Sequence, residues 1–243
     1  MPTKIVTTTT TVIEDDGKVT ADTETVTTKI VDRGIPTLYT YWRSSCSWRV
    51  RLALNWKGIK FDSVPVHLVK DGGEQLKPSY TRVNPMMQVP TLAIDDLVLS
   101  ESIAIIEYLD EAKGGRAILP ADPVSRAKVR EIVNIIASGI QPVQNLRVLR
   151  KHGIDKKVEW GQWAINHGFV ALEEKLTTTA GKYCLGDEVT LADMCLVPQV
   201  YNAKRFKVDM SKYPTIARIN EALATLPEFE KAHPSAQPDA QPA

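Results

Sequence analysis

The spacing of apolar residues divides the chain into a mixed segment and a helical one. Between 36 and 113 it predicts a strand, a helix, a strand, a short segment, a hairpin and a helix, in that order. The expected bounds are 37–42 (strand), 45–57 (helix), 60–66 (strand), 76–83 (short segment), 89–94 with 97–99 (hairpin) and a last helix capped by Ser100. Parallel and antiparallel strand pairs are therefore expected in one sheet.

The second half shows only helical periodicity. Its helices are expected at 124–150, 156–179, 190–205 and 215–226. Pro142 would kink the first of these helices. Thr190 and Asp193 fit the N-cap and N3 positions of a capping box, so Asp193 is interpreted as structural. The pattern predicts an α/β thioredoxin-like N-terminal domain joined to an all-α C-terminal domain.

Changes in composition along the chain predict the limits of these domains. The expected divisions are an extension at 1–34, the thioredoxin-like domain at 35–117, a linker at 118–123, the all-helical domain at 124–233 and a tail at 234–243. In the Thr-rich extension, Asp16-Gly17 between alternating runs predicts a hairpin, either mobile or ordered by packing on the body or on another copy. Three prolines predict a frayed tail at the C-terminus.

Composition narrows the class of function. The hydrophobic content of 43% is ample for a packed core, and a net charge of +1 argues against nucleic acid or an anionic membrane as partner. No uncharged stretch reaches the roughly 18 apolar residues that span a bilayer. Cys46, Cys184 and Cys195 form no metal spacing and no even disulfide set, and the four histidines are scattered, so no metal site is expected. A reducing compartment, the cytosol, is the expected location.

Residues 44–51, with the sequence SSCSWRVR, place hydroxyls and a thiol where a strand leads into a helix. The N-terminus of a helix stabilises a thiolate. Position 49, three residues after Cys46, is Arg rather than a second Cys, which excludes a dithiol cycle within this motif. Three interpretations remain: a bound thiol cofactor activated by Ser44 or Ser45, a monothiol mechanism at Cys46, or a simple helix cap beside a small buried thiol.

The chain resembles the zeta class of the glutathione transferases. Besides 44–51, the segments that carry the resemblance are 69–73 (VKDGG), 84–92 (NPMMQVPTL), 139–146 (GIQPVQNL) and 203–209 (AKRFKVD). Together they extend over about 36–235, nearly the whole chain apart from the N-terminal extension. The resemblance implies the glutathione transferase fold, glutathione as cofactor and a homodimer.

The same resemblance assigns roles to residues of this chain. It implies that Ser44, Ser45, Cys46 and Arg205 are catalytic, and that glutathione is bound by Ser44, Ser45, Cys46, Gln75, Gln88, Val89, Glu101, Ser102, Gln141 and Asn145. The Val89–Pro90 peptide would be cis, although sequence alone favours trans. Gln141 and Asn145 lie four apart and would share one face of the first helix of the second domain. Cys46 is expected to tune glutathione rather than act as the obligatory nucleophile.

The implied activity is the glutathione-dependent isomerisation of maleylacetoacetate to fumarylacetoacetate in tyrosine and phenylalanine catabolism. A thiolate would add to the cis double bond, the resulting single bond would rotate, and elimination would give the trans isomer. A side activity on α-haloacids is also implied. Two other interpretations stay open: a non-catalytic scaffold, and a glutaredoxin-like thiol transferase acting through Cys46.

Overall fold

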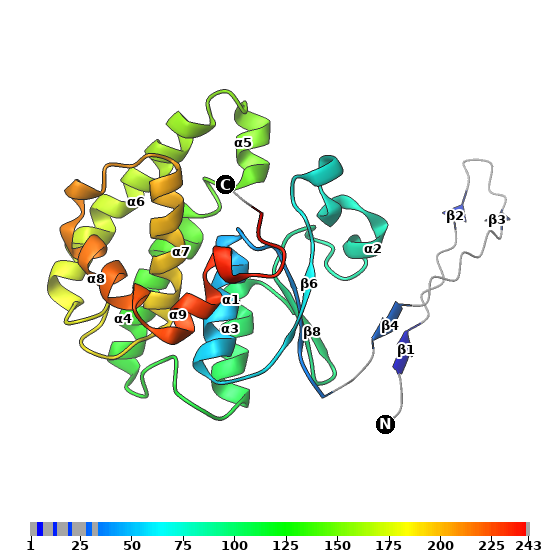
Figure 1. Ribbon diagram of the computed structural model, residues 1–243, viewed down its shortest axis with the longest axis horizontal. Coiled ribbons are helices and arrows are strands. Elements are labelled where there is room, and N and C mark those ends of the chain that lie inside the picture. Colours follow the sequence, from blue (N-terminus) through cyan, green and yellow to red (C-terminus); the bar gives the residue numbers. More distant parts are fainter. Residues whose placement is uncertain (1–3, 7–11, 14–18, 21–27, 31–33, 242–243) are drawn as a thin grey trace.

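A four-stranded mixed sheet lies at the centre of the N-terminal half (Figure 1). The computed structural model describes residues 4–6, 12–13, 19–20, 28–30 and 34–241. The strands of the sheet are β5 (Thr37–Thr40), β6 (Asp62–Pro65), β7 (Thr91–Ile94) and β8 (Leu97–Ser100), in the order β6-β5-β7-β8. β5 pairs in parallel with β6 and antiparallel with β7, and β7 pairs antiparallel with β8. The predicted mixture of strand directions is confirmed.

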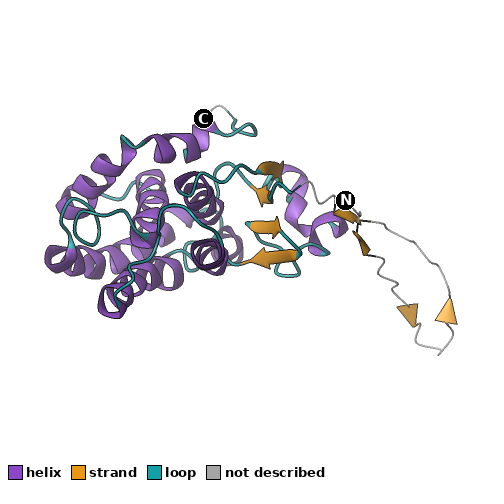
Figure 2. Cartoon of the chain, turned by 90° about the horizontal axis from the view of Figure 1, so that it is seen from below, coloured by secondary structure: helices purple, strands orange, loops and turns teal. Residues whose placement is uncertain are grey.

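Helices cover both faces of this sheet. α1 (Ser45–Trp56) and α3 (Ser102–Ala112) lie on the side that faces the helical half, and α2 (Pro78–Thr81) lies on the other (Figures 1 and 2). Two short 3-10 turns precede α2: η1 (Lys70–Gly72) and η2 (Glu74–Leu76). Apolar side chains of α1 and α3 are fully buried between the sheet and the helical half, so one core extends through both halves.

The start of α3 differs from the prediction that Ser100 caps it. Ser100 is still paired with Thr91 as the last residue of β8. Because the pairing continues to Ser100, the chain can turn into the helix only at Glu101, which holds the N-cap position with φ 69° and makes no side-chain capping bond. A positive φ is uncommon for a residue with a Cβ, and such strain is concentrated at functional sites.

Helices make up the C-terminal half, as predicted, and among its described residues the β pairing is limited to two isolated bridges. Its elements are α4 (Pro123–Asn134), the π-helical turn η3 (Ile135–Ile140), α5 (Leu146–His152), α6 (Lys157–Thr179), α7 (Leu191–Arg205), η4 (Met210–Lys212), α8 (Pro214–Ala224), α9 (Pro227–Ala232) and η5 (Pro234–Ala236). α7 begins with the predicted capping box of Thr190 and Asp193. Burial raises the pKa of the Asp193 carboxyl, although backbone N–H groups donate to it.

The predicted helix 124–150 is broken rather than kinked. It ends at Asn134, widens into η3, and restarts as α5 after Asn145, whose side chain accepts the N–H of Arg147 at 3.1 Å. The N–H of Gln141 donates to the carbonyl of Ile136, five residues back, at 2.9 Å. Pro142 has no N–H to continue any helical ladder, so the chain leaves the helix there.

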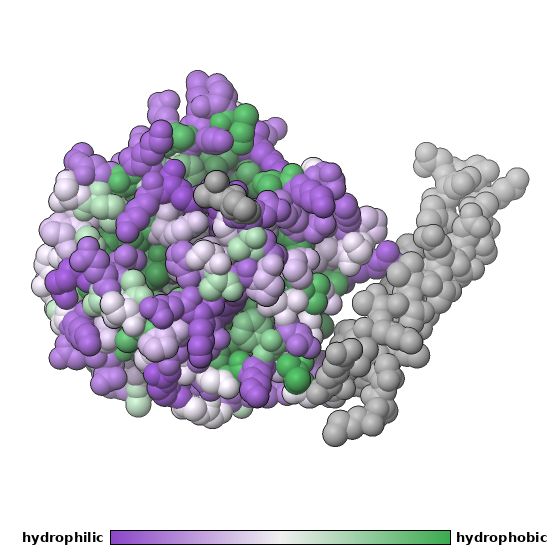
Figure 3. Space-filling model, viewed as in Figure 1, coloured by the Kyte–Doolittle hydropathy of each residue, from purple (hydrophilic) through white to green (hydrophobic). Residues whose placement is uncertain are grey.

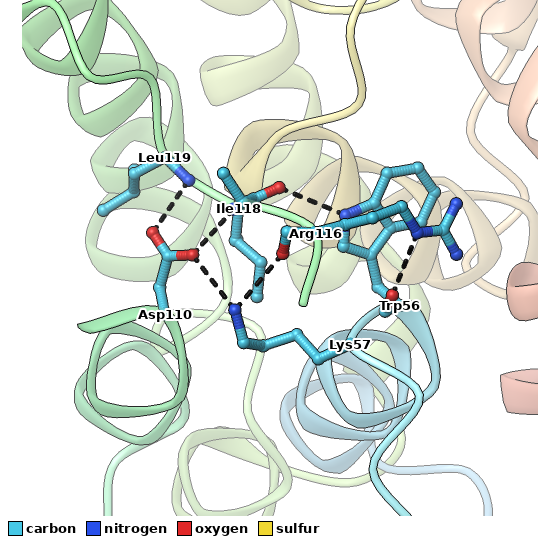
Figure 4. A network of polar contacts seen from close by, with 7 residues as sticks. Trp56, Lys57, Asp110, Arg116, Ile118 and Leu119 are labelled. Carbon is cyan, nitrogen blue, oxygen red and sulfur yellow. Dashed lines mark hydrogen bonds and ion pairs between the residues drawn. The ribbon is translucent and has the colours of Figure 1, made fainter. Parts of the chain in front are cut away.

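A polar network fixes the segment that leaves the N-terminal half (Figure 4). Asp110 at the end of α3 accepts the N–H groups of Ile118 and Leu119, at 2.8 and 3.0 Å. Lys57 Nζ lies 3.5 Å from Asp110 Oδ1 and donates to the carbonyl of Arg116 at 3.2 Å. Ile118 and Leu119 are themselves buried in the core. The predicted linker therefore begins with a fixed segment, since its backbone donors end on a buried carboxylate.

The expectation of a frayed C-terminal tail is wrong for residues 234–241. After η5, Gln237 donates its side-chain amide to the carbonyls of Lys231 and His233, both at 2.9 Å. The N–H of Trp42 donates to Asp239 Oδ2 at 2.9 Å, and Ala240 packs against the apolar cluster that contains Trp42. These long-range contacts hold the segment, and composition could not reveal them.

The described residues of the N-terminal extension form four short strands. β1 (Lys4–Val6) pairs antiparallel with β4 (Thr28–Ile30), and β2 (Val12–Ile13) pairs antiparallel with β3 (Val19–Thr20). The predicted hairpin turn at Asp16-Gly17 lies outside the described residues. None of the described helices is long and apolar enough to cross a membrane.

Candidate active site

The turn between β5 and α1 fixes the position of Ser44. The N–H of Ser44 donates to the carbonyl of Tyr41 at 2.9 Å, which closes the turn. Ser44 is the N-cap of α1, with φ −71° and ψ 119°, and its Oγ accepts the N–H of Ser47 at 3.2 Å. That bond uses a lone pair of the oxygen and leaves the hydroxyl proton free to donate. Ser44 therefore presents a hydrogen-bond donor at the positive end of a helix dipole.

A cleft between the two halves holds every predicted site residue. Three hollows of about 160, 390 and 550 Å³ make up this cleft, and Gln141 and Asn145 line all three. Ser44 lines the first and third, and Cys46 lines the second and third. The other predicted residues line one or two of the hollows: Ser45, Gln75, Gln88, Val89, Glu101, Ser102 and Arg205. The structure thus brings together residues that lie up to 161 positions apart, from 44 to 205.

The 390 Å³ hollow offers a segment of backbone, a negatively charged group and a site that favours an anion. Val89 lies on its wall, and the Val89–Pro90 peptide is cis, as the family resemblance implied. Glu101 and Ser102 lie beside it at the start of α3, where helical N–H groups are unpaired and favour an anion. A carboxylate for an ammonium group and an anion site for a carboxylate are therefore adjacent.

Arg49 is a site residue that the sequence prediction missed. Its side chain is 2% exposed, and Nη1 donates to Ser102 Oγ at 3.3 Å and approaches Cys46 Sγ at 3.8 Å. Its Nε and Nη2 atoms have no hydrogen-bond partner among the described residues. A buried cation with unused donors strengthens the positive field at the start of α1 and α3. The available signal was a charged residue in the buried stripe of an otherwise apolar helix.

Two glutamines line the sheet side of the 550 Å³ hollow. Gln75 is buried; its Nε2 donates to the carbonyl of Leu68 at 3.4 Å, while its Oε1 has no partner in the described part of the chain. The carbonyl of Gln88 is held by Tyr80 Oη at 2.5 Å and Asn84 Nδ2 at 2.9 Å. Gln75 therefore offers an acceptor that only a ligand or water can satisfy.

The helical side of the cleft is assembled differently from the prediction. Gln141 follows η3 and Asn145 precedes α5, so the two residues do not share the face of one continuous helix. They still line the same cleft because the broken segment turns them both toward the N-terminal half. The Oδ1 atom of Asn145 is engaged as the cap of α5.

Several basic side chains line the cleft. Arg43 and Arg205 line the 160 Å³ hollow beside Ser44, and Arg147, Arg150 and Lys151 line the 550 Å³ hollow. Burial and the neighbouring charge of Arg43 lower the pKa of Arg205, whose Nη1 donates to Asn202 Oδ1 at 3.3 Å. No salt bridge joins Arg43 or Arg205 to a described carboxylate. Two unpaired guanidinium groups near one hydroxyl form a site for an anion.

The described part of the chain contains no candidate metal-binding site. No group of three or more His, Cys, Asp or Glu side chains lies close enough together there to hold an ion. The three cysteines are free thiols, and Cys184 and Cys195 are buried in the helical half. Burial raises the pKa of Cys195 to about 11, so this thiol stays protonated. Cys46 is the cysteine that lines the cleft.

Comparison with known proteins gives the class. The family model described as Glutathione S-transferase, N-terminal domain, matches residues 43–112, and the one described as Glutathione S-transferase, C-terminal domain, matches 149–227. The maleylacetoacetate isomerase of Rattus norvegicus is 56% identical over 206 residues, which cover 85% of this chain and 95% of the rat protein. The chain belongs to the glutathione S-transferase family.

Solved structures refine this position to the zeta class. The holo structure of maleyl pyruvate isomerase, a bacterial zeta-class enzyme, superposes with a TM-score of 0.80 at 41% identity and covers 84% of this chain and 100% of that one. Maleylacetoacetate isomerase from Anaeromyxobacter dehalogenans, solved with glutathione in its active site, has a TM-score of 0.77 at 43% identity and covers 85% and 98%.

Proposed function

We propose that this chain is a glutathione-dependent isomerase that converts maleylacetoacetate to fumarylacetoacetate in tyrosine and phenylalanine catabolism. The observation that carries the proposal is the Ser44 hydroxyl, placed at the N-terminus of α1 where two hollows meet. The 390 Å³ hollow offers polar groups suited to a tripeptide, and the 160 Å³ hollow offers Arg43 and Arg205. The relatives named above support the same reaction.

The polar groups of the cleft fit glutathione, which carries two carboxylates, an ammonium group and a thiol. Glu101 pairs with the ammonium, and the Ser102 hydroxyl and N–H groups of α3 hold the glutamyl carboxylate. Arg49 orients the Ser102 hydroxyl from behind. Val89 pairs its backbone with the cysteinyl unit.

The remaining contacts of the tripeptide come from side-chain amides. Gln75, with its unpartnered oxygen, lies toward the glycyl end, and Gln88 lies beside the tripeptide backbone. Gln141 and Asn145 close the cleft from the helical half. Each of these amides lines the 550 Å³ hollow, which extends from Ser44 to the basic residues of α5.

When bound, glutathione supplies a thiolate that adds to the cis double bond and departs after rotation about the resulting single bond. The protein's contribution is to keep that sulfur ionised. An ordinary thiol with a pKa near 8.5 is only about 3% ionised at pH 7. The Ser44 hydroxyl donates to the sulfur, and the N-terminus of α1 adds its dipole. A pKa lowered by about two units would ionise most of the bound thiol.

The unpaired arginines fit the rest of the reaction. Maleylacetoacetate carries carboxylates, and negative charge also develops on its conjugated oxygen when the sulfur adds. Arg43 and Arg205 lie beside Ser44 with no described carboxylate paired to them, so they can hold both charges. The same arrangement suits an α-haloacid, whose carboxylate would be held while the halide leaves; we propose this as a side activity.

Ser45 and Cys46 would act more weakly. Ser45 is buried in the first turn of α1 and lines the hollow beside Ser44. Cys46 is half-buried, with Arg49 as its neighbour, and orients glutathione rather than replacing it. The rival interpretation, a thiol transferase acting through Cys46, requires the Cys46 thiol itself to be essential.

The test is isomerisation of maleylacetone, a stable substrate analogue, followed by absorbance with and without glutathione. We expect glutathione-dependent turnover by the wild type and a fall in kcat of about 100-fold in Ser44→Ala, the usual cost of removing one preorganised donor. Ser47→Ala is the matched control, because Ser47 is in the same turn, fully buried, and lines none of the three hollows.

Two results would contradict the proposal. One is turnover without glutathione or no turnover by the wild type. The other is a reversed ranking, in which Cys46→Ala abolishes activity and Ser44→Ala preserves it; this would favour the thiol transferase. Absence of both turnover and glutathione binding would favour the scaffold.

We further propose a cytosolic homodimer, with domains at 35–117 and 124–233. The free state of all three cysteines fits a reducing compartment. Light scattering during size exclusion measures the oligomeric state, and limited proteolysis checks the limits of the domains. A monomer at micromolar concentration would contradict the first proposal, and preferred cleavage within α1 or α6 would contradict the second.

A further inference from the structure

The turn 41–44, which carries Ser44, is bound by a residue near the C-terminus, Asp239. Trp42 and Arg43 are its central residues, and Tyr41 and Trp42 are buried, so their backbone groups need partners. The N–H of Trp42 donates to Asp239 Oδ2 at 2.9 Å, across 197 positions of sequence. In Figure 1 this segment is drawn in red, beyond α9 toward the C-terminus.

Arg51 holds the other side of the same turn. Its side chain is fully buried, and Nη2 donates to the carbonyl of Trp42 at 2.9 Å. Nη1 donates to Thr40 Oγ1 at 3.1 Å and to the carbonyl of Tyr41 at 3.4 Å. Nε donates to the carbonyl of Ala232 at 3.2 Å, at the end of α9. One guanidinium group therefore joins the turn to the base of the C-terminal segment.

The charges of the two side chains complement each other. Burial lowers the pKa of Arg51 to about 9, and the Asp239 carboxylate opposes this by raising it. A buried cation is stable only with compensating hydrogen bonds and negative charge nearby. Asp239 supplies the charge and also binds the turn, so both contacts depend on the C-terminal segment being in place.

We infer that Asp239 and Arg51 are positioning residues for Ser44: they grip the backbone of the turn 41–44 and so set where the Ser44 hydroxyl points. The inference rests on the proposed role of Ser44. Asp239 accepts the N–H of Trp42, and Arg51 donates to its C=O. The N–H of Ser44, two residues after Trp42, donates to the carbonyl of Tyr41. A shift of about 1 Å in a reacting group can cost as much as 100-fold in rate.

The test compares Asp239→Ala with the wild type in two assays. Glutathione is titrated on the enzyme by the ultraviolet absorbance of its thiolate, and maleylacetone turnover gives kcat and the KM for glutathione. We expect a higher apparent pKa of the bound thiol and a fall in kcat of about tenfold, with the KM for glutathione within about twofold. A purely structural role would not move the thiol pKa.

Three further variants sharpen the test. Asp239→Asn keeps an oxygen that can accept from Trp42 and should restore kcat to within about threefold of the wild type. A chain ending at Ala236 lacks Asp239 and should match Asp239→Ala. Glu230→Ala is the control: Glu230 is an exposed acidic residue of α9, so its substitution removes the same charge as Asp239→Ala. It should leave both assays unchanged.

The outcomes separate this inference from the proposed function. An unchanged thiol pKa and kcat in both Asp239→Ala and the shortened chain, with a Ser44→Ala variant that is inactive, would overturn the inference alone. If Ser44→Ala stayed active, the proposed function would fail first. Circular dichroism melting verifies that each variant is folded, and the shortened chain decides the question if Asp239→Ala does not fold.

Discussion

The two sides of the cleft are built in different ways. On the side of the N-terminal half, the proposed glutathione contacts other than Gln75 come from short stretches, 44–46, 88–89 and 101–102, in which neighbours in sequence are neighbours in the site. On the helical side, Gln141 and Arg205 come from separate elements. The first side is set by local backbone geometry, and the second by how helices pack.

The chemistry of the two sides differs as well. The N-terminal side offers one carboxylate, hydroxyls, helical N–H groups and two arginines, Arg43 and Arg49, whereas the charged groups of the helical side are all basic: Arg147, Arg150, Lys151 and Arg205. The surface seen in Figure 3 is mostly hydrophilic, with apolar side chains scattered among polar ones. We expect glutathione and the second substrate to be recognised independently. The first two predictions below test this separation, and the third tests the C-terminal segment beside it.

The largest effect is expected from Arg205→Ala. Loss of an unpaired cation beside Ser44 should lower kcat/KM for maleylacetone by about 30- to 100-fold, since hydrogen bonds to charged groups contribute about 1.5–3 kcal/mol. The KM for glutathione should not change. Steady-state kinetics with each substrate varied in turn measures both. Lys204→Ala is the control, an exposed neighbour that lines none of the three hollows. A large rise in the KM for glutathione would break the comparison.

Glu101→Ala is expected to show the opposite pattern at a smaller size. Without the carboxylate that pairs with the ammonium of glutathione, the KM for glutathione should rise about tenfold while kcat stays close to the wild type. Alanine retains the Cβ, so the positive φ at this position is no easier to adopt. Glu111→Ala, an exposed change on the same helix, is the control. An equal fall in kcat would show that the two sides are coupled.

The smallest effect concerns pH and the C-terminal segment. Burial, followed by the charge of Arg51, lowers the pKa of His233 below its ordinary value of about 6.5. The neutral ring accepts the N–H of Ser235 at 3.2 Å and packs edge-on against Trp48 and Tyr201. In this range the unfolded chain binds more protons than the folded one, so His233's contribution is complete above pH 6.5 and is lost as the pH falls through the folded-state pKa.

Thermal melting between pH 7.5 and 5 measures this contribution. The melting temperature should fall by a few degrees for the wild type. The fall should be smaller in His233→Gln, while His152→Gln, a change at an exposed ring, should behave as the wild type. Identical pH profiles for all three proteins would show that His233 does not stabilise the segment.

Local signals were sufficient for much of the fold. The strand, turn and helix around Ser44, the hairpin of β7 and β8 and the capping box of α7 were predicted because each depends on residues within a few positions. The errors arose where a distant contact decided the outcome. Pairing with β7 carried Ser100 into a strand, and the helix predicted at 124–150 gave way to η3, which packs against α6 and α7.

The sequence by itself determined the succession of a mixed and a helical half, the family resemblance and a set of site residues that all line the cleft. Only the tertiary structure decided that Arg49 and Arg51 are buried, and that Asp239 reaches the turn before Ser44. The physical reason is that periodicity and capping depend on neighbouring residues, whereas the partner of a buried charge comes from a segment that is distant in sequence and is brought close only in the folded structure. A terminal segment with the composition of a flexible tail is ordered here by contacts with distant residues, among them the bond from the buried N–H of Trp42 to Asp239.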